Sequence, residues 1–181
     1  MGPSDMGIGM TDINFSTLAS DGYNIVDSLI RSMASTFHWI RVKAICYATE
    51  DEDIICDTVS QLAGTEELDI DISEGLHNNP LTVVDANLTK NKEYAALFGN
   101  LGEDVLRGIL EDIDARVDDD CVFYVRLDKQ KAVCGEYAIT HGGDVISITA
   151  KIMAHPAKKE VALKVITDYI NQMLPAPQRS L

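Results

Sequence analysis

The densest group of side chains that could do chemistry lies in the run Arg-Leu-Asp-Lys-Gln-Lys at residues 126–131. The guanidinium of Arg126 and the ammonium groups of Lys129 and Lys131 are good hydrogen-bond donors to phosphate oxygens. The amide of Gln130 can bond a base edge or a ribose hydroxyl. An exposed charged turn with a local Asp–Lys pair explains the same run without any ligand, and the spacing by itself favours that explanation.

The usual catalytic and metal-binding patterns are missing from the sequence. No G-x-x-x-x-G-K-[ST], G-x-G-x-x-G, H-E-x-x-H or G-x-S-x-G occurs. None of the scattered histidines (His38, His77, His141 and His155) lies at zinc-ligand spacing from a cysteine. The acidic run at 118–120 lacks the Asp-x-Asp-x-Asp-Gly pattern of calcium loops, so a solvated turn explains it. We therefore expect no catalytic residue, metal or cofactor, and an enzyme is the least favoured class.

The basic residues of the chain are unevenly distributed. The formal net charge is −14, with 29 Asp and Glu against 15 Lys and Arg. Residues 126–164 nevertheless contain seven basic and four acidic residues, a local net charge of +3. Because a strongly acidic protein repels nucleic-acid phosphates in general, only such a locally basic region could bind them. The acidic remainder equally suits docking to a basic partner protein.

Length and composition indicate one folded domain. The chain has 181 residues and is 46% hydrophobic and 24% charged, which is close to the globular average. Its four cysteines form no C-x-x-C pair, as is typical of reduced cysteines in a cytoplasmic protein. No stretch approaches the roughly 20 apolar residues that span a bilayer, and the first ten residues lack a signal-peptide pattern. We expect a cytoplasmic protein without a membrane partner; its oligomeric state stays open.

Hydrophobic periodicity predicts the elements that must position these residues. β-Forming runs cover 39–47, 67–74, 81–88, 121–127 and 145–153, and a further brief strand ends at the turn 141–144. Helical patterns cover 23–35, 49–63, 91–100, 103–115 and 157–174, with a short helix or turn over 128–135. Thr49 and Glu52 form a predicted capping box, and Gly64 ends that helix.

Hairpin-length connections between these elements predict the fold class. We expect an α+β fold, a two-layer, mainly antiparallel sheet with helices on one face, plus an N-terminal helix. The expected boundaries are a flexible segment at 1–20, a helix at 21–36, the α+β domain at 37–175 and a tail at 176–181. In the first strand Arg41 and Lys43 share a face that we expect to be open to solvent.

Four segments, in order along the chain, resemble an archaeal family described as exosome-associated RNA-binding proteins. They are Ala48-Thr-Glu-Asp-Glu-Asp, Glu74-Gly-Leu-His-Asn-Asn-Pro, Phe123-Tyr-Val-Arg-Leu-Asp-Lys-Gln and Ala154-His-Pro-Ala. The resemblance covers about residues 37–174. The sequence departs from the family at Leu76, where a second histidine is frequent, and at Asn78, near an expected glycine. It also departs at Lys131 and Val133-Cys134, where the family has a more apolar run.

The resemblance implies a fold like that of a large-subunit ribosomal protein and the double-stranded-RNA-binding domain. It also implies a non-catalytic accessory protein that binds structured RNA, linked to RNA processing through the exosome or ribosomal RNA. The residues expected to contact phosphates and 2′-hydroxyls are Arg126, Lys129, Gln130, Lys131, Arg41, Lys43, His77 and Lys151. The alternative is an acidic protein-interaction adaptor without direct RNA contact, in which the basic run is merely structural.

Overall fold

The computed structural model describes residues 36–75 and 79–175. Its elements are β1 (Phe37–Tyr47), α2 (Glu52–Ala63), β2 (Asp69–Glu74), β3 (Pro80–Leu88), α3 (Asn91–Leu101), α4 (Glu103–Glu111), α5 (Ile113–Arg116), β4 (Val122–Asp128), α6 (Lys129–Val133), β5 (Val145–Ile152) and α7 (Lys159–Met173). The segments expected at 1–20 and 176–181, and all of the helix expected at 21–36 except Thr36, lie outside the described residues.

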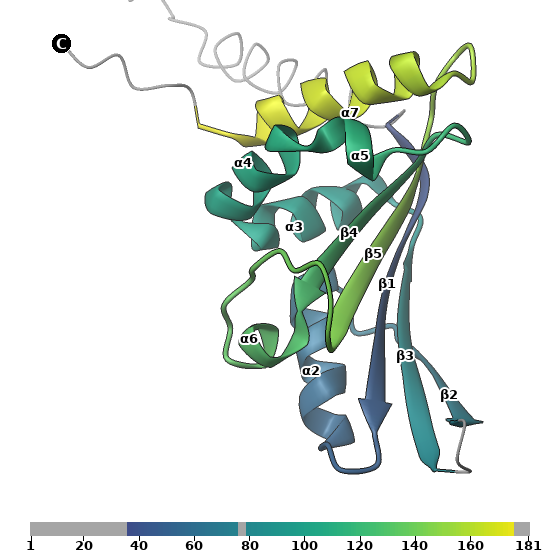
Figure 1. Cartoon of the computed structure of the whole chain (residues 1–181), viewed down its shortest axis with the longest axis vertical. Coiled ribbons are helices and arrows are strands. Elements are labelled where there is room, and N and C mark those ends of the chain that lie inside the picture. Colours follow the sequence, from purple (N-terminus) through teal and green to yellow (C-terminus); the bar gives the residue numbers. More distant parts are fainter. Residues whose placement is uncertain (1–35, 76–78, 176–181) are drawn as a thin grey trace, which may run out of the picture. The chain divides into compact units, whose positions relative to one another are not determined.

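The five strands form one antiparallel sheet in the order β2-β3-β1-β5-β4. Figure 1 shows the helices gathered on one side of this sheet. The expected α+β fold with a mainly antiparallel sheet and helices on one face is confirmed. The long central strand β1 pairs with both β3 and β5, so it connects the two halves of the sheet.

Alternation along the strands separates a buried face from an open face. In β5 every second residue is buried, beginning with Ile146 and ending with Ile152, and β4 alternates in the same way. The buried set packs against the helices around an aromatic cluster, in which the Phe98 ring lies 5.6 Å from that of Phe37 and 5.1 Å from that of Tyr169. The remaining strand residues face away from the helices.

Two local expectations about α2 have different outcomes. Gly64 ends the helix at φ +69°, and a Cβ atom there would lie 2.8 Å from the Cβ of Ala96, so glycine is required on two grounds. The capping box predicted at Thr49 is wrong. Asp51 caps the helix by accepting from the backbone N–H groups of Asp53 and Ile54, while Glu52 accepts from the Thr82 hydroxyl at 2.8 Å.

Two further boundaries differ from those expected. The helix predicted at 103–115 divides at Asp112 into α4 and α5. The brief strand predicted before the turn at 141–144 is reduced to a single bridge between Ile139 and Leu127. Both differences lie where the chain passes the β4 edge of the sheet, so tertiary packing overrides the local pattern.

Candidate functional site

The open face of β1, β5 and β4 collects basic and aromatic side chains. Residues directly opposite each other in an antiparallel pair point to the same face. The register places Lys43 opposite Ser147 and Ser147 opposite Arg126. The next row on the same face, two residues further along each strand, consists of Arg41, Thr149 and Tyr124. The row after that consists of Trp39, Lys151 and Val122. We call the set Trp39, Arg41, Lys43, Tyr124, Arg126 and Lys151 the basic face.

The charges on the basic face differ in how far they are neutralised. The Arg41 guanidinium donates to both carboxylate oxygens of Asp85, at 2.9 and 2.6 Å, and this hydrogen bonding raises the pKa of Arg41 against a smaller effect of burial. Among the described residues, Lys43 and Arg126 have no ion-pair partner. Lys151 donates to the backbone carbonyl of Asp120. A carbonyl has no net charge, so this bond does not neutralise the positive charge of Lys151. Three cations are therefore available to an anion.

Two large aromatic side chains are exposed on the basic face. Trp39 is 40% exposed and Tyr124 is 47% exposed. The Tyr124 hydroxyl donates to Asp118 at 3.1 Å. Desolvation, together with this bond, raises the pKa of Tyr124, so the phenol stays neutral. The sequence interpretation missed both aromatic residues as part of a site, although the alternation in each strand places them beside Arg41 and Arg126.

A groove of about 450 Å³ opens beside Tyr124 and Arg126 at the β4 edge. Its lining includes the small side chains Ser147 and Thr149 of β5, and also His141 from the turn before β5. The lining also includes the hydroxyl of Thr140 and the Arg116–Asp112 ion pair, so hydroxyl and charged groups lie around the groove. Such a lining can accept a planar ring and donate hydrogen bonds to its edge.

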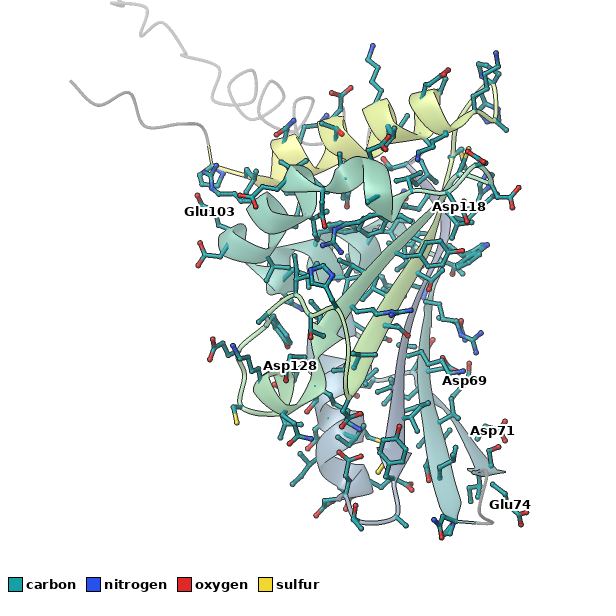
Figure 2. All side chains as sticks on the ribbon, in the orientation of Figure 1. Asp69, Asp71, Glu74, Glu103, Asp118 and Asp128 are labelled. Atoms are coloured by element: carbon teal, nitrogen blue, oxygen red, sulfur yellow. The ribbon has the colours of Figure 1, made fainter. Side chains whose placement is uncertain are left out.

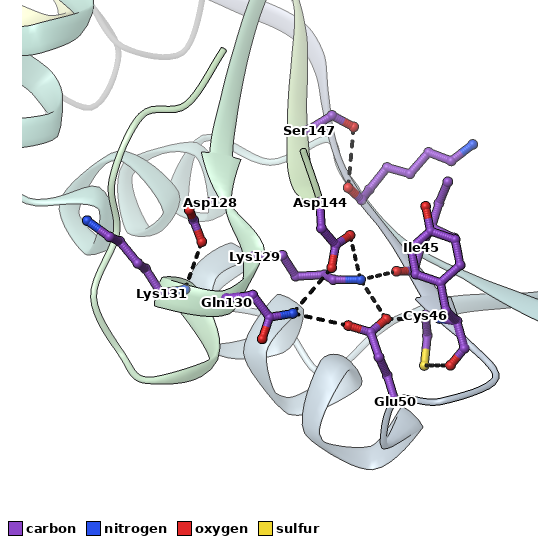
Figure 3. A network of polar contacts seen from close by, with 11 residues as sticks. Ile45, Cys46, Glu50, Asp128, Lys129, Gln130, Lys131, Asp144 and Ser147 are labelled. Atoms are coloured by element: carbon purple, nitrogen blue, oxygen red, sulfur yellow. Dashed lines mark hydrogen bonds and ion pairs between the residues drawn. The ribbon is translucent and has the colours of Figure 1, made fainter. Parts of the chain in front are cut away.

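Lys129 lies in a different environment, which Figure 3 shows from close by. Its side chain is fully buried. The ammonium group donates to the Ile45 carbonyl at 2.5 Å, and contacts Glu50 and Asp144 at 2.7 Å each. The ring of Tyr47 lies 4.9 Å away. We call Lys129, Glu50 and Asp144 the Lys129 cluster.

Hydrogen bonds within the Lys129 cluster favour the charged forms of Lys129 and Glu50. Burial by itself would lower the pKa of Lys129, but the hydrogen bonds to Asp144 and Glu50 raise it. Burial would likewise raise the pKa of Glu50, but hydrogen bonds from Lys129 and from the Tyr47 backbone N–H lower it. The cluster ties α6 to the end of β1 and the start of β5. A side chain held in this way does not face an external phosphate.

The structure brings together only part of the residue set expected from the sequence. Arg41, Lys43, Arg126 and Lys151 share the basic face. Gln130 instead lies 3.4 Å from Glu50 and 3.3 Å from Asp144, beside the Lys129 cluster, and the exposed Lys131 belongs to the same short helix α6, which packs against α2. His77 lies outside the described residues.

The comparisons with known proteins identify the family of this chain. Residues 39–152 match the family model described as RNA binding. The chain belongs to this RNA-binding family. The RNA-binding protein PAB1135 of Pyrococcus abyssi is 32% identical over 148 residues, which cover 74% of this chain and 93% of that protein.

Two solved structures of archaeal DUF54 proteins are also similar to this member of the RNA-binding family. Mth689 of Methanothermobacter thermautotrophicus is 30% identical with a TM-score of 0.65, over 75% of this chain and 98% of its own. AF2318 of Archaeglobus fulgidus is 30% identical with a TM-score of 0.63, over 76% of this chain and 99% of its own.

The segment that matches the family model begins at Trp39 and ends at Ile152, so it contains every residue of the basic face. It also contains the whole Lys129 cluster. Within residues 36–75 and 79–175, no group of three or more His, Cys, Asp or Glu side chains could hold a metal ion. In the same ranges no helix has the length and apolar character needed to cross a membrane.

Proposed function

We propose that this member of the RNA-binding family binds structured RNA without catalysing a reaction. The observation that carries the proposal is the meeting of Lys43, Arg126 and Lys151 on one sheet face of a chain whose net charge is −14. Each of these cations can donate to a phosphate, and the hydroxyls of Ser147 and Thr149 lie between them to bond 2′-hydroxyl groups.

The acidic remainder of the protein supports a defined binding orientation. Phosphates are repelled by most of the surface, so the basic face is the place where they approach most favourably. Three phosphate contacts predict that affinity for double-helical RNA falls about 40-fold between about 50 and 200 mM salt, if the known slope for B-form DNA also applies here. A salt-insensitive interaction would contradict this mode of binding.

We further propose that the protein acts as an accessory factor in cytoplasmic RNA processing, with the exosome or ribosomal RNA. The resemblance stated from the four sequence segments supports this finer role. Affinity capture of the full chain from extract tests it, with and without ribonuclease treatment. Recovery of exosome subunits or ribosomal RNA would support the link, and recovery of neither would remove it.

Charge reversal on the basic face tests the proposal of RNA binding. Lys43→Glu combined with Arg126→Glu should weaken binding of an RNA hairpin at least tenfold at low salt, measured by fluorescence anisotropy, because two donors become repulsive. The matched control is Lys158→Glu with Lys164→Glu, an equal change of net charge at two exposed residues, one before and one within α7. If both variants lose affinity equally, the basic face is not the binding surface.

A second candidate function is that of an acidic adaptor for a basic protein. It is favoured by β2, the last strand of the sheet, whose six residues are all exposed. Asp69, Asp71 and Glu74 project outward at this edge in Figure 2, and Ile70 and Ile72 are 51% and 78% exposed. An extended basic segment could pair with such an edge. Asp69→Lys with Asp71→Lys should abolish adaptor binding and leave RNA affinity undiminished.

A further inference from the structure

The two exposed aromatic residues of the basic face lie on the two strands that flank β5. Trp39 belongs to the same row as Lys151, whereas Tyr124 belongs to the neighbouring row of Thr149. Trp39 and Tyr124 lie two strand spacings of about 4.8 Å apart across the sheet, and two residues of about 3.4 Å apart along the strands. Their Cα atoms are therefore separated by about 12 Å. This is more than three times the roughly 3.4 Å separation of stacked bases. The two rings can therefore receive two separate bases.

On this face β5 carries Ser147, Thr149 and Lys151, of which the first two are small. Ser147 and Thr149 lie between the larger residues of β1 and β4, and both line the groove beside Tyr124. On either side of β5, the neighbouring strand presents an aromatic ring and a cation on this face. In β4 these are Tyr124 and Arg126, and in β1 they are Trp39 and Arg41. Alternating aromatic and basic groups match the alternating bases and phosphates of an unpaired strand.

We propose that the basic face binds unpaired nucleotides, with one base stacked on Trp39 and another on Tyr124. This rests on the proposed function and names its substrate class: single-stranded segments of an otherwise structured RNA, such as a loop or a bulge. Arg126 and Lys43 hold phosphates of the same segment. A continuous duplex uses the cations but not the rings, because its base faces are already covered by neighbouring base pairs.

The Tyr124 ring is held in place for such a contact. Asp118 accepts from the Tyr124 hydroxyl at 3.1 Å and also from the Val122 backbone N–H at 2.8 Å. The hydroxyl is thus used within the protein, and the face of the ring is left for a ligand. A ring that is already oriented loses little rotational freedom on stacking.

Trp39 is the single tryptophan of the chain, so its fluorescence reports on this site alone. The experiment titrates the full protein with an unstructured RNA oligomer and with a duplex of the same length. Stacking of a base should quench Trp39 with the single strand and leave it unchanged with the duplex. In parallel, fluorescence anisotropy measures the affinity for both RNAs.

Substitution of the rings supplies the second measurement. Tyr124→Ala and Trp39→Ala should each weaken single-strand binding about tenfold or more and change duplex binding less than twofold. Tyr124→Phe keeps the ring and loses only the hydrogen bond to Asp118, so it is the matched control and should retain most of the single-strand affinity. Thermal unfolding of each variant verifies that it is folded.

The outcomes separate the stacking inference from the proposed function. In one outcome, both RNAs bind in a manner that depends on Lys43 and Arg126, but Trp39 fluorescence is not quenched and the alanine variants lose no affinity. This outcome overturns the stacking inference and leaves the proposal of RNA binding intact. Absence of binding to either RNA at low salt removes the proposed function itself. Quenching by the single strand together with selective loss in Tyr124→Ala supports the inference.

Discussion

Arg126 and Lys129 are three residues apart in the sequence and lie in opposite environments. Arg126 is exposed on the basic face and has no ion-pair partner among residues 36–75 and 79–175. Lys129 is fully buried, with two carboxylates and a carbonyl around its ammonium group. One cation is therefore available to a ligand, and the other holds three elements together. Equal charge and close sequence position do not imply an equal role.

The largest expected effect is the loss of stability on removing the buried cation. Lys129→Met keeps the length of the side chain and leaves Glu50 and Asp144 without their counter-charge, so it should lower the free energy of unfolding by about 3 kcal/mol. Urea denaturation measures this change. Lys43→Met, on the basic face, is the matched control and should change stability by less than about 0.5 kcal/mol. Equal losses of unfolding free energy in the two variants would contradict the structural role assigned to Lys129.

The same cluster predicts how stability depends on pH. The pKa of Glu50 lies below its ordinary value of 4.5, so its contribution is present above about pH 4.5 and is lost as the pH falls through the lowered pKa. The pKa of Lys129 lies above its ordinary value of 10.5, so its contribution is complete below that pH and is lost as the pH rises further. Urea denaturation midpoints measured as a function of pH check this. The difference in midpoint between wild type and Lys129→Met should become smaller at both the acidic and the alkaline end of the pH range.

Removal of a single cation from the basic face should change the salt dependence of RNA binding. Arg126→Ala should weaken binding of every RNA and reduce the slope of log affinity against log salt by about one. Lys131→Ala, an exposed lysine of α6, is the control and should leave the slope unchanged. Anisotropy titrations at several salt concentrations measure both. A larger effect at Lys131 would place the interface on α6 instead.

The smallest expected effect concerns Asp85, which partly neutralises the basic face. Asp85→Asn keeps a hydrogen-bond acceptor for Arg41 and removes the negative charge, so RNA affinity should rise about two- to threefold at low salt. Asn87→Asp, on the same face of β3, adds a negative charge and should therefore lower RNA affinity. Unchanged affinity in both variants would show that the β3 side of the sheet lies outside the interface.

Much of the fold follows from local patterns of residue type. The alternation in β4 and β5 and the glycine after α2 each specify an element or its end, because burial and backbone geometry act over a few residues. Prediction was weaker where distant segments compete for one side chain. Glu52 did not complete the predicted capping box at Thr49, because Asp51 caps the helix and Glu52 is engaged by Thr82 of β3, 30 residues away.

The sequence by itself determined that Arg41 and Lys43 share one face of a strand, since successive side chains alternate. It also determined that Arg126 lies within the strand β4 and that Lys129 follows the end of this strand. Only the tertiary structure decided that Arg126 is exposed and Lys129 is buried. Strand order and register brought Arg126 across Ser147 to Lys43, and placed Glu50 and Asp144 around Lys129. These are long-range pairings, and no local pattern encodes a partner about 80 residues away.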